Sequence, residues 1–250
     1  MDANRIPEDV AAAINESWPN GAIEEFDTDE SYFHDIRAAL ERDLRKISRA
    51  SLLWQTEARD YSSNWDRDDD DWEHDEPPPS RDFQSYHVFF LVPLGNEFEF
   101  ETETESLKEP EDPEDPNSDV VTVTVPGKGQ YGCSVAVSYA SPFASVSFCE
   151  YVQFEDGSYS TPDPSNFAYF DEQTGEPVDP AMQYRDALGE RAFAKLENLR
   201  AGIAKVLAKH RVVVLDQAIL DLPAPDLRAD SDVFAGETLS VRDAFFFRGV

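Results

Sequence analysis

The sequence is poor in cysteine, in lysine and in long apolar runs. It has two cysteines, Cys133 and Cys149, and six lysines among 250 residues. Two widely spaced cysteines are too few for a zinc framework or a set of disulfides, so we expect reduced thiols, no metal site and no other cofactor. No stretch approaches the roughly 18 consecutive apolar residues that a membrane helix needs.

The N-terminal residues carry no recognisable targeting signal. The segment MDANRIPEDVAAAINESW lacks the basic start and the apolar run of a secretory leader. With an apolar fraction of 40% the chain has enough hydrophobic residues to bury a core. We therefore expect a folded, soluble, cytoplasmic protein.

Acidic residues are in large excess. The chain has 52 aspartates and glutamates against 21 lysines and arginines, for a net charge of −31. Such a charge repels nucleic-acid phosphates and anionic lipid, and it attracts basic proteins. We therefore expect a basic protein partner and neither direct nucleic-acid nor membrane contact; the sequence does not indicate an oligomeric state.

The acidity is concentrated in one part of the chain. Residues 57–119 contain 22 acidic and four basic residues. They include an acidic segment at about 60–81, closed by three prolines, and a second proline-rich acidic segment at about 107–118. Proline and like charge both oppose regular structure, so we expect two exposed loops, the first of them mobile.

Three helices are predicted. One begins near Pro7, a second runs from Ser31 to Ser51 with an apolar stripe, and a long one runs from Asp179 and Pro180 to about Lys209. Between them the sequence alternates as strands do. The predicted strands are Tyr86–Leu94, Glu97–Glu105, Val120–Val125, Tyr131–Tyr139, Phe143–Phe154 and Arg211–Asp216.

These elements predict a single α+β domain over residues 1–250. Its centre is an antiparallel sheet of about six to eight strands, flanked by two N-terminal helices and the long helix near 180–209. We interpret Gly127–Gly132 as a turn between two strands. Pairing Tyr139 with Phe143 across the Ser141–Pro142 turn would put Cys133 opposite Cys149, whereas a slip of one residue would separate them.

The most specific pattern is a row of glutamates at alternate positions. A strand places such residues on one face, about 7 Å apart. One interpretation is an acidic ladder that imitates a polyanion and occupies a basic cleft; the other is the solvated face of an ordinary antiparallel strand. The ladder consists of Glu97, Glu99, Glu101, Glu103 and Glu105.

The acidic loop at about 60–81 offers a second candidate surface. Two tryptophans flank a run of aspartates there, and aromatic side chains often anchor protein interfaces. The run lacks the spacing and central glycine of a calcium loop, so an exposed loop or a docking loop is the better interpretation. The candidate partner-binding residues are Trp65, Asp68, Asp69, Asp70, Asp71 and Trp72.

No catalytic constellation emerges from the sequence. The four histidines show no paired-ligand spacing, and no helix terminus adjoins Cys149 to activate it. We therefore expect a non-catalytic, protein-binding protein, such as an immunity-type or antitoxin-type inhibitor that occupies a basic, nucleic-acid-binding surface. One alternative is an accessory subunit of a prokaryotic defence complex, docked by Phe245–Phe247 and the tryptophan loop. Another is a salt-adapted enzyme with an unrecognised carboxylate site.

Overall fold

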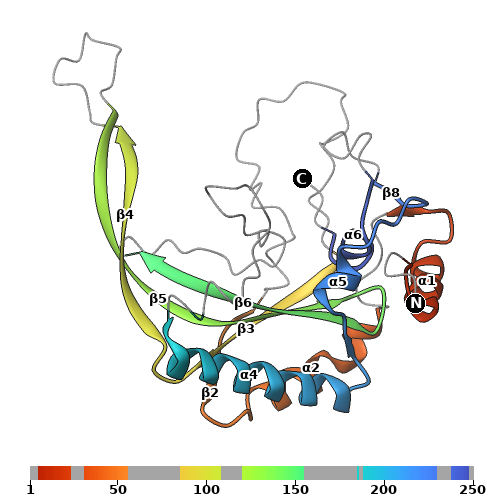
Figure 1. Cartoon of the computed structure of the whole chain (residues 1–250), viewed down its shortest axis with the longest axis horizontal. Helices are drawn as coiled ribbons and strands as arrows, with labels where there is room; N and C mark the ends of the chain where they lie inside the picture. Colours follow the sequence, from red (N-terminus) through yellow and green to blue (C-terminus); the bar gives the residue numbers. More distant parts are fainter. Residues whose placement is uncertain are drawn as a thin grey trace, which may run out of the picture.

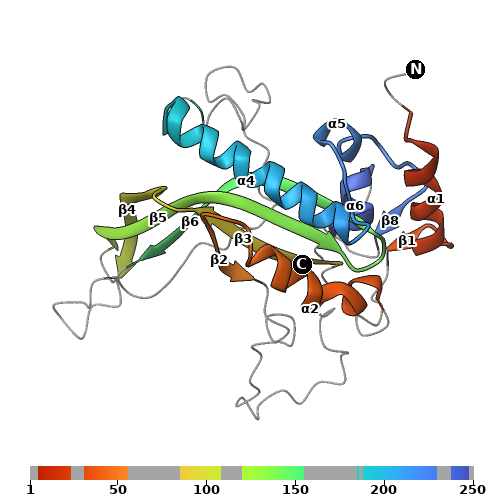
Figure 2. The ribbon, with the colours of Figure 1, turned by 90° about the horizontal axis from the view of Figure 1, so that it is seen from below.

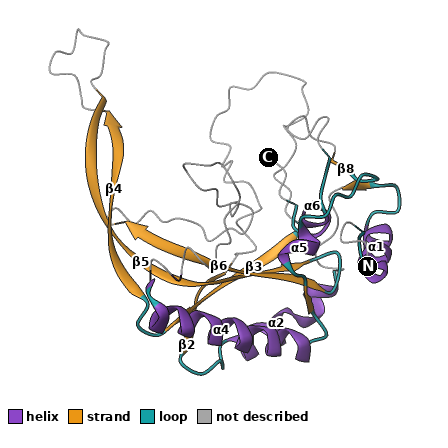
Figure 3. Cartoon of the chain, in the orientation of Figure 1, coloured by secondary structure: helices purple, strands orange, loops and turns teal. Residues whose placement is uncertain are grey.

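The computed structural model describes residues 5–23, 31–55, 85–107, 120–154, 185, 188–229 and 238–247. A curved sheet with helices packed on it dominates the described part (Figures 1 and 3). The sheet has six strands in the order β2-β3-β5-β6-β7, with β4 paired to β5 beside this path. Two short strands, β1 and β8, form a separate parallel pair. The predicted α+β class is confirmed.

The sheet is antiparallel except at one edge, where β7 runs parallel to β6. The predicted strands at 86–94, 97–105 and 143–154 are confirmed, whereas the predicted strand at 211–216 is reduced to two residues. The main strands are β2 (Ala50–Gln55), β3 (Tyr86–Pro93), β4 (Glu97–Leu107), β5 (Val120–Ser138), β6 (Phe143–Phe154) and β7 (Val213–Val214).

The prediction of a turn at Gly127–Gly132 is wrong. These residues lie inside β5, a single strand of 19 residues that joins the two strands expected on either side. Gly127 and Gly129 pair with β4 and with β6, so their backbone hydrogen bonds continue the sheet. Glycine inside a strand permits close approach of neighbouring groups. Figure 1 shows that β5 is strongly curved along its length.

The helices occupy two positions. α2 (Tyr32–Leu44) and α4 (Glu190–Lys209) lie on one side of the sheet, and α1 (Glu8–Ser17), α5 (Gln217–Leu220) and α6 (Val241–Phe245) gather at one end with β1 (Ala22–Ile23) and β8 (Arg228–Ala229) (Figures 1 and 2). The first helix begins after Pro7, as predicted. The expected start of the long helix at Asp179–Pro180 lies outside the described residues, but the prediction of one helix up to Lys209 is wrong: Gly189 has a left-handed backbone (φ 75°), and α4 begins at Glu190.

The predicted extent of the second helix is wrong at its C-terminus. Ser31 caps α2 by accepting a hydrogen bond from the His34 amide, but the helix ends at Leu44 rather than Ser51. Arg49 has a left-handed backbone (φ 61°), and Ala50 begins β2, which pairs with β3. The apolar stripe continued past the helix because Ile47, Ala50 and Leu52 still pack on the same core. Packing of residues beyond the helix on this core therefore produced an apolar spacing that resembles that of a helix.

Each face of the sheet has its own core. On the side of α2 and α4, Phe33, Leu40, Phe193 and Ile203 pack against alternate residues of β3 and β5. On the other side, Tyr86 and Ala136 pack with Val10, Trp18 and the C-terminal phenylalanines. Phe245, Phe246 and Phe247 are at most 5% exposed. They belong to this core, so they do not form the exposed aromatic cluster that the defence-subunit alternative used.

The predicted register of the β5–β6 hairpin is wrong by one residue. Cys133 pairs with Phe148, and Cys149 pairs with Gly132. Because side chains alternate along a strand, this shift separates the two cysteines between the two faces of the sheet. Cys133 lies in the core beneath α2 and α4, and Cys149 packs with Phe90 and Val92 on the other face. Both are free thiols.

Candidate functional site

The glutamate ladder lies on an edge strand. Glu97, Glu99, Glu101, Glu103 and Glu105 occupy alternate positions of β4, which pairs only with β5 among the described strands. They stand opposite Gln130, Lys128, Pro126, Thr124 and Thr122. Glu97 is exposed, and Gln130 Nε2 donates to its Oε1 at 3.4 Å. For the other four glutamates the structure describes the backbone.

The outer part of the ladder lies where only two described strands remain, whereas Glu97 and Glu99 stand opposite residues of β5 that also pair with β6. β3 pairs with β5 only between Leu91–Cys133 and Tyr86–Ser138, and β6 pairs with β5 no further than Gly127. Beyond that point the described partner of β5 is β4 alone, and the two strands extend away from the helical layer (Figure 1). We call β4 and residues 120–130 of β5 the acidic arm.

The base of the acidic arm is tightly packed at Gly132. A Cβ atom on this residue would collide with the Leu91 carbonyl oxygen and would lie 2.7 Å from two ring carbons of Phe90. Phe90 in turn packs with Cys149 and Tyr151. Because Gly132 has no side chain, β3 and β5 can pack closely at this point, two residues after the arm ends at residue 130.

The second predicted surface cannot be placed. Trp65, Asp68, Asp69, Asp70, Asp71 and Trp72 lie in residues 56–84, outside the described residues. The loops predicted at about 60–81 and 107–118 fall outside them as well, except for Leu107 at the end of β4. The structure therefore places the five glutamates on one strand, and the position of the tryptophan loop relative to them is not described.

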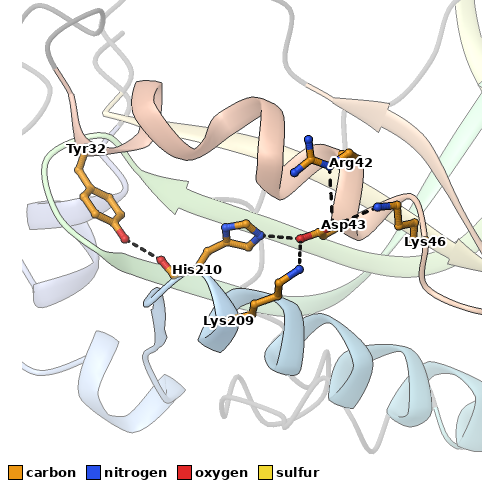
Figure 4. Close-up of polar contacts among 6 residues, drawn as sticks. All are labelled: Tyr32, Arg42, Asp43, Lys46, Lys209 and His210. Carbon is orange, nitrogen blue, oxygen red and sulfur yellow. Dashed lines mark hydrogen bonds and ion pairs between the residues drawn. The ribbon is translucent and has the colours of Figure 1, made fainter.

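A cluster that sequence analysis did not predict lies where α2 meets the C-terminal end of α4 (Figure 4). Its centre is Asp43, whose side chain is 10% exposed. Lys209 Nζ donates to Asp43 Oδ2 at 2.6 Å, and His210 Nε2 lies 3.0 Å from the same oxygen. Lys46 Nζ approaches Asp43 Oδ1 at 3.5 Å, and Arg42 Nε lies 4.0 Å from it. One carboxylate thus holds four basic side chains from two helices.

The cluster around Asp43, which we call the junction of α2 and α4, has more positive than negative charges. Hydrogen bonds from Lys209 and His210 hold the pKa of Asp43 far below its ordinary value, so the carboxylate stays charged. Tyr32, at the other end of α2, donates from its hydroxyl to the His210 carbonyl at 2.7 Å and fixes the end of α4 (Figure 4). The junction is therefore an ordered, positively charged site in an acidic protein.

A simple count would have revealed this cluster. Residues 31–49 and 188–211 contain 11 of the 21 basic residues and only five acidic ones, a net charge of +6. The rest of the chain has ten basic and 47 acidic residues, a net charge of −37. The contrast between the two helical segments and the remainder was present in the sequence, although their contact across Asp43 was not.

The buried ionisable groups belong to the cores. Burial raises the pKa of both cysteine thiols, which disfavours the nucleophilic thiolate. His87 is 1% exposed, and burial lowers its pKa to about 3, with a smaller contribution from the nearby Arg37. Its ring stacks on Phe33 at 4.9 Å between centroids, and its Nδ1 lies 3.5 Å from the Tyr139 hydroxyl. His87 and Cys149 face opposite cores, so they cannot act as a base and nucleophile pair.

The described residues contain no group of three or more histidine, cysteine, aspartate or glutamate side chains that could hold a metal ion. Within the same ranges, every helix is too short or too polar to cross a membrane.

No known protein supplies a function by similarity. No family model matches the chain, and neither the curated proteins nor the solved structures contain a match to it. The two surfaces of opposite charge are therefore the basis for inferring function.

Proposed function

We infer that this is a cytoplasmic, non-catalytic binding protein whose acidic arm occupies a basic surface of a protein partner. The observation behind the proposal is that five glutamates alternate along β4, a strand whose one partner among the described strands is β5. An immunity-type or antitoxin-type inhibitor of a nucleic-acid-binding protein is the class that fits best. In this role the arm competes with nucleic acid for the partner and does not itself contact nucleic acid.

The geometry of a strand suits such competition. Side chains at alternate positions repeat at about 7 Å, which is about two phosphate steps of one DNA strand. A paired strand also fixes the backbone that carries the carboxylates, so little conformational entropy remains to be lost when a partner binds. A flexible acidic peptide would incur that entropic cost.

The density of like charge also supports the proposal. Across β4 and β5 the ladder faces one cation, Lys128, and four uncharged residues. Like charges along one strand repel one another and oppose folding. A row of this kind is useful where it accelerates association with a positive surface, because steered association reaches rates well above those of neutral partners.

The test begins with the partner. The tagged protein is expressed in its native host, the protein that copurifies with it is identified and purified, and the association rate is measured at several salt concentrations. We expect the partner to be basic and to lose its affinity for nucleic acid when this protein is present. The variant Glu99→Gln, Glu101→Gln, Glu103→Gln should associate about tenfold or more slowly at low salt, with a smaller difference at high salt.

The control is a variant that removes three negative charges outside the acidic arm. Glu190, Glu197 and Asp216 are exposed acidic residues outside the arm. Changing them to Gln, Gln and Asn alters the net charge equally and should leave the association rate close to that of the wild type. Equal rates for the wild type and the arm variant would exclude the ladder from binding. Turnover of a substrate by the isolated protein would instead favour the enzyme alternative.

A further inference from the structure

Six exposed cations lie in α2 and α4 or in the residues that directly follow these helices, and we call them the basic face. They are Arg42, Lys46, Arg49, Lys205, Lys209 and Arg211. Two contacts hold the helices that carry them together. Asp43 joins Lys209 to the end of α2, and a Cβ atom on Gly202 would lie 3.3 Å from Ile47, so the segment after α2 crosses α4 within one turn of Lys205.

We propose that the basic face binds the phosphate backbone of a nucleic acid. The helical segments around it have a net charge of +6 within a protein of net charge −31. Lys205 and Lys209 are four residues apart on α4, so they lie on the same side of that helix, about 6 Å apart along its axis. This inference is independent of the acidic arm and its partner.

The cations of the basic face are only partly neutralised within the protein. Among the described residues, Asp43 is the one acidic residue that Arg42, Lys46 and Lys209 contact. Arg49, Lys205 and Arg211 make no side-chain hydrogen bond or ion pair within the same part of the chain. Asp43 thus orders three cations, and no described acidic side chain neutralises the other three.

The backbone presents two of these arginines in an unusual conformation. Arg49 (φ 61°) and Arg211 (φ 60°) are the two residues other than glycine that have a left-handed backbone in the described ranges. Arg211 directly follows His210, the C-cap of α4, where glycine or asparagine is the common choice, whereas Arg49 lies in the turn between α2 and β2. A long cationic side chain at both positions is consistent with selection for charge at this surface.

The composition of the basic face favours nucleic acid over an acidic protein. Protein interfaces usually contain large apolar or aromatic anchors, whereas nucleic-acid interfaces are more polar and more positively charged. Among the described residues the exposed large hydrophobic side chains are Leu53, Leu94 and Val213. The Leu94 amide donates to the Arg49 carbonyl at 3.0 Å and Val213 follows Arg211 by two residues, so isolated apolar side chains border the basic face without forming a cluster on it. Phosphates can be bound without such anchors.

The net charge of the whole chain does not exclude this binding. Charges farther apart than about 10 Å are largely screened at 0.1 M salt. The helical layer is itself about 10 Å thick, so acidic groups beyond the sheet act weakly on a ligand at its outer surface. The expectation that net charge keeps nucleic acid away therefore applies to the acidic regions, and the basic face is an exception to it.

The experiment measures binding of labelled DNA to the full-length protein. The probes are a single strand and a duplex of about 20 nucleotides, with fluorescence anisotropy recorded between 50 and 200 mM salt, the range over which phosphate contacts are strongly salt-dependent. We expect binding that weakens with salt. The triple variant Arg49→Gln, Lys205→Gln, Arg211→Gln should lower affinity about tenfold or more, and it should reduce the slope of log K against log salt by about two to three.

A matched variant separates local from overall charge. Arg5, Lys128 and Arg228 are exposed and lie outside the basic face. Their replacement by glutamine changes the net charge equally and should leave DNA affinity within about twofold. Equal losses in both variants would overturn the proposal, and so would binding of a poly-glutamate probe but not DNA, or binding of neither probe. The ladder variant of β4 should bind DNA at least as well as the wild type, so failure of one surface is distinguishable from failure of the other.

Discussion

The acidic arm and the basic face concentrate charge of opposite sign by different means. In the arm, like charges follow one another along a strand, and backbone pairing with β5 holds them in place. On the basic face, one carboxylate, Asp43, gathers cations from two helices that are already fixed by a shared core. The comparison shows that the net charge of −31 averages two surfaces that would attract different partners.

The two regions also differ in what supports them. The basic face overlies a core that contains Phe33, Leu40, Phe193 and Ile203, each at most 1% exposed. The acidic arm continues past the last residues that pair with β3 and β6. We therefore expect changes beneath the helices to affect global stability, and changes in the arm to affect charge and association more than folding. Four predictions test this difference, in order of decreasing effect.

Acid should destabilise the helical side first. The pKa of His87 is about 3 in the folded protein and about 6.5 when unfolded, so below pH 6.5 the unfolded chain takes up a proton that the native protein does not. Stability is therefore lost as the pH falls, by up to about 1.4 kcal/mol per pH unit, or about 2 kcal/mol between pH 6.5 and 4.5. His87→Leu should flatten this part of the curve, measured by urea unfolding.

The exposed His34 on α2 provides the control substitution for that experiment. If His34→Gln changed the slope of stability against pH as much as His87→Leu does, the effect would not be specific to the buried imidazole. Parallel curves for His87→Leu and the wild type would show that the buried imidazole does not set the acid response.

A substitution at the base of the arm should have the next largest effect. Gly132→Ala places a Cβ atom against the Leu91 carbonyl and the Phe90 ring, and the backbone oxygen cannot move aside cheaply. We expect a loss of about 1–3 kcal/mol in urea unfolding. Gly202→Ala is the control, because its Cβ would meet only the flexible Ile47 side chain at 3.3 Å and should cost less than about 1 kcal/mol. Equal losses would argue against a special role for Gly132.

The sequence predicted the strands of the sheet better than the turns and the strand register. β3, β4 and β6 were recognisable because their apolar runs and alternation reflect burial on the sheet. Gly127–Gly132 was misinterpreted because glycine marks both turns and tight strands, and only the partners Leu91 and Phe90 decide between them. The cysteine register failed for a similar reason, since a turn of several residues permits two pairings that differ by one position.

The candidate surfaces were predictable to different degrees. The glutamate ladder is local in sequence, and alternation alone placed it on a strand. The basic face joins Asp43 to Lys209 across 166 positions, and no local pattern specifies that contact. Its net charge could have been counted from the two helical segments, but their proximity depends on how α2 and α4 share the core beneath them.

A smaller effect on stability is expected when the left-handed backbone at Arg211 is given to glycine. Arg211→Gly should raise stability by about 0.5–1 kcal/mol in urea unfolding, because glycine adopts φ near 60° without the cost that a larger residue incurs. The same change removes a cation and should weaken DNA binding. Arg211→Gln keeps the Cβ atom and loses the charge, so it should weaken binding without the gain in stability. If both variants were more stable than the wild type, the arginine charge rather than its left-handed backbone would be what destabilises the protein at this position.

The smallest change in stability is expected in the arm. Glu99→Gln, Glu101→Gln, Glu103→Gln removes like charges from one strand and keeps its shape, so stability should rise by about 0.5 kcal/mol at low salt and by less at high salt, measured by urea unfolding. The acidic triple variant at Glu190, Glu197 and Asp216 separates this local relief from the effect of net charge, because those residues lie outside the ladder. A ladder variant that is more stable yet associates more slowly would show that the row of glutamates opposes folding and promotes binding. A loss of stability would mean instead that the glutamates make contacts within the protein that glutamine cannot replace.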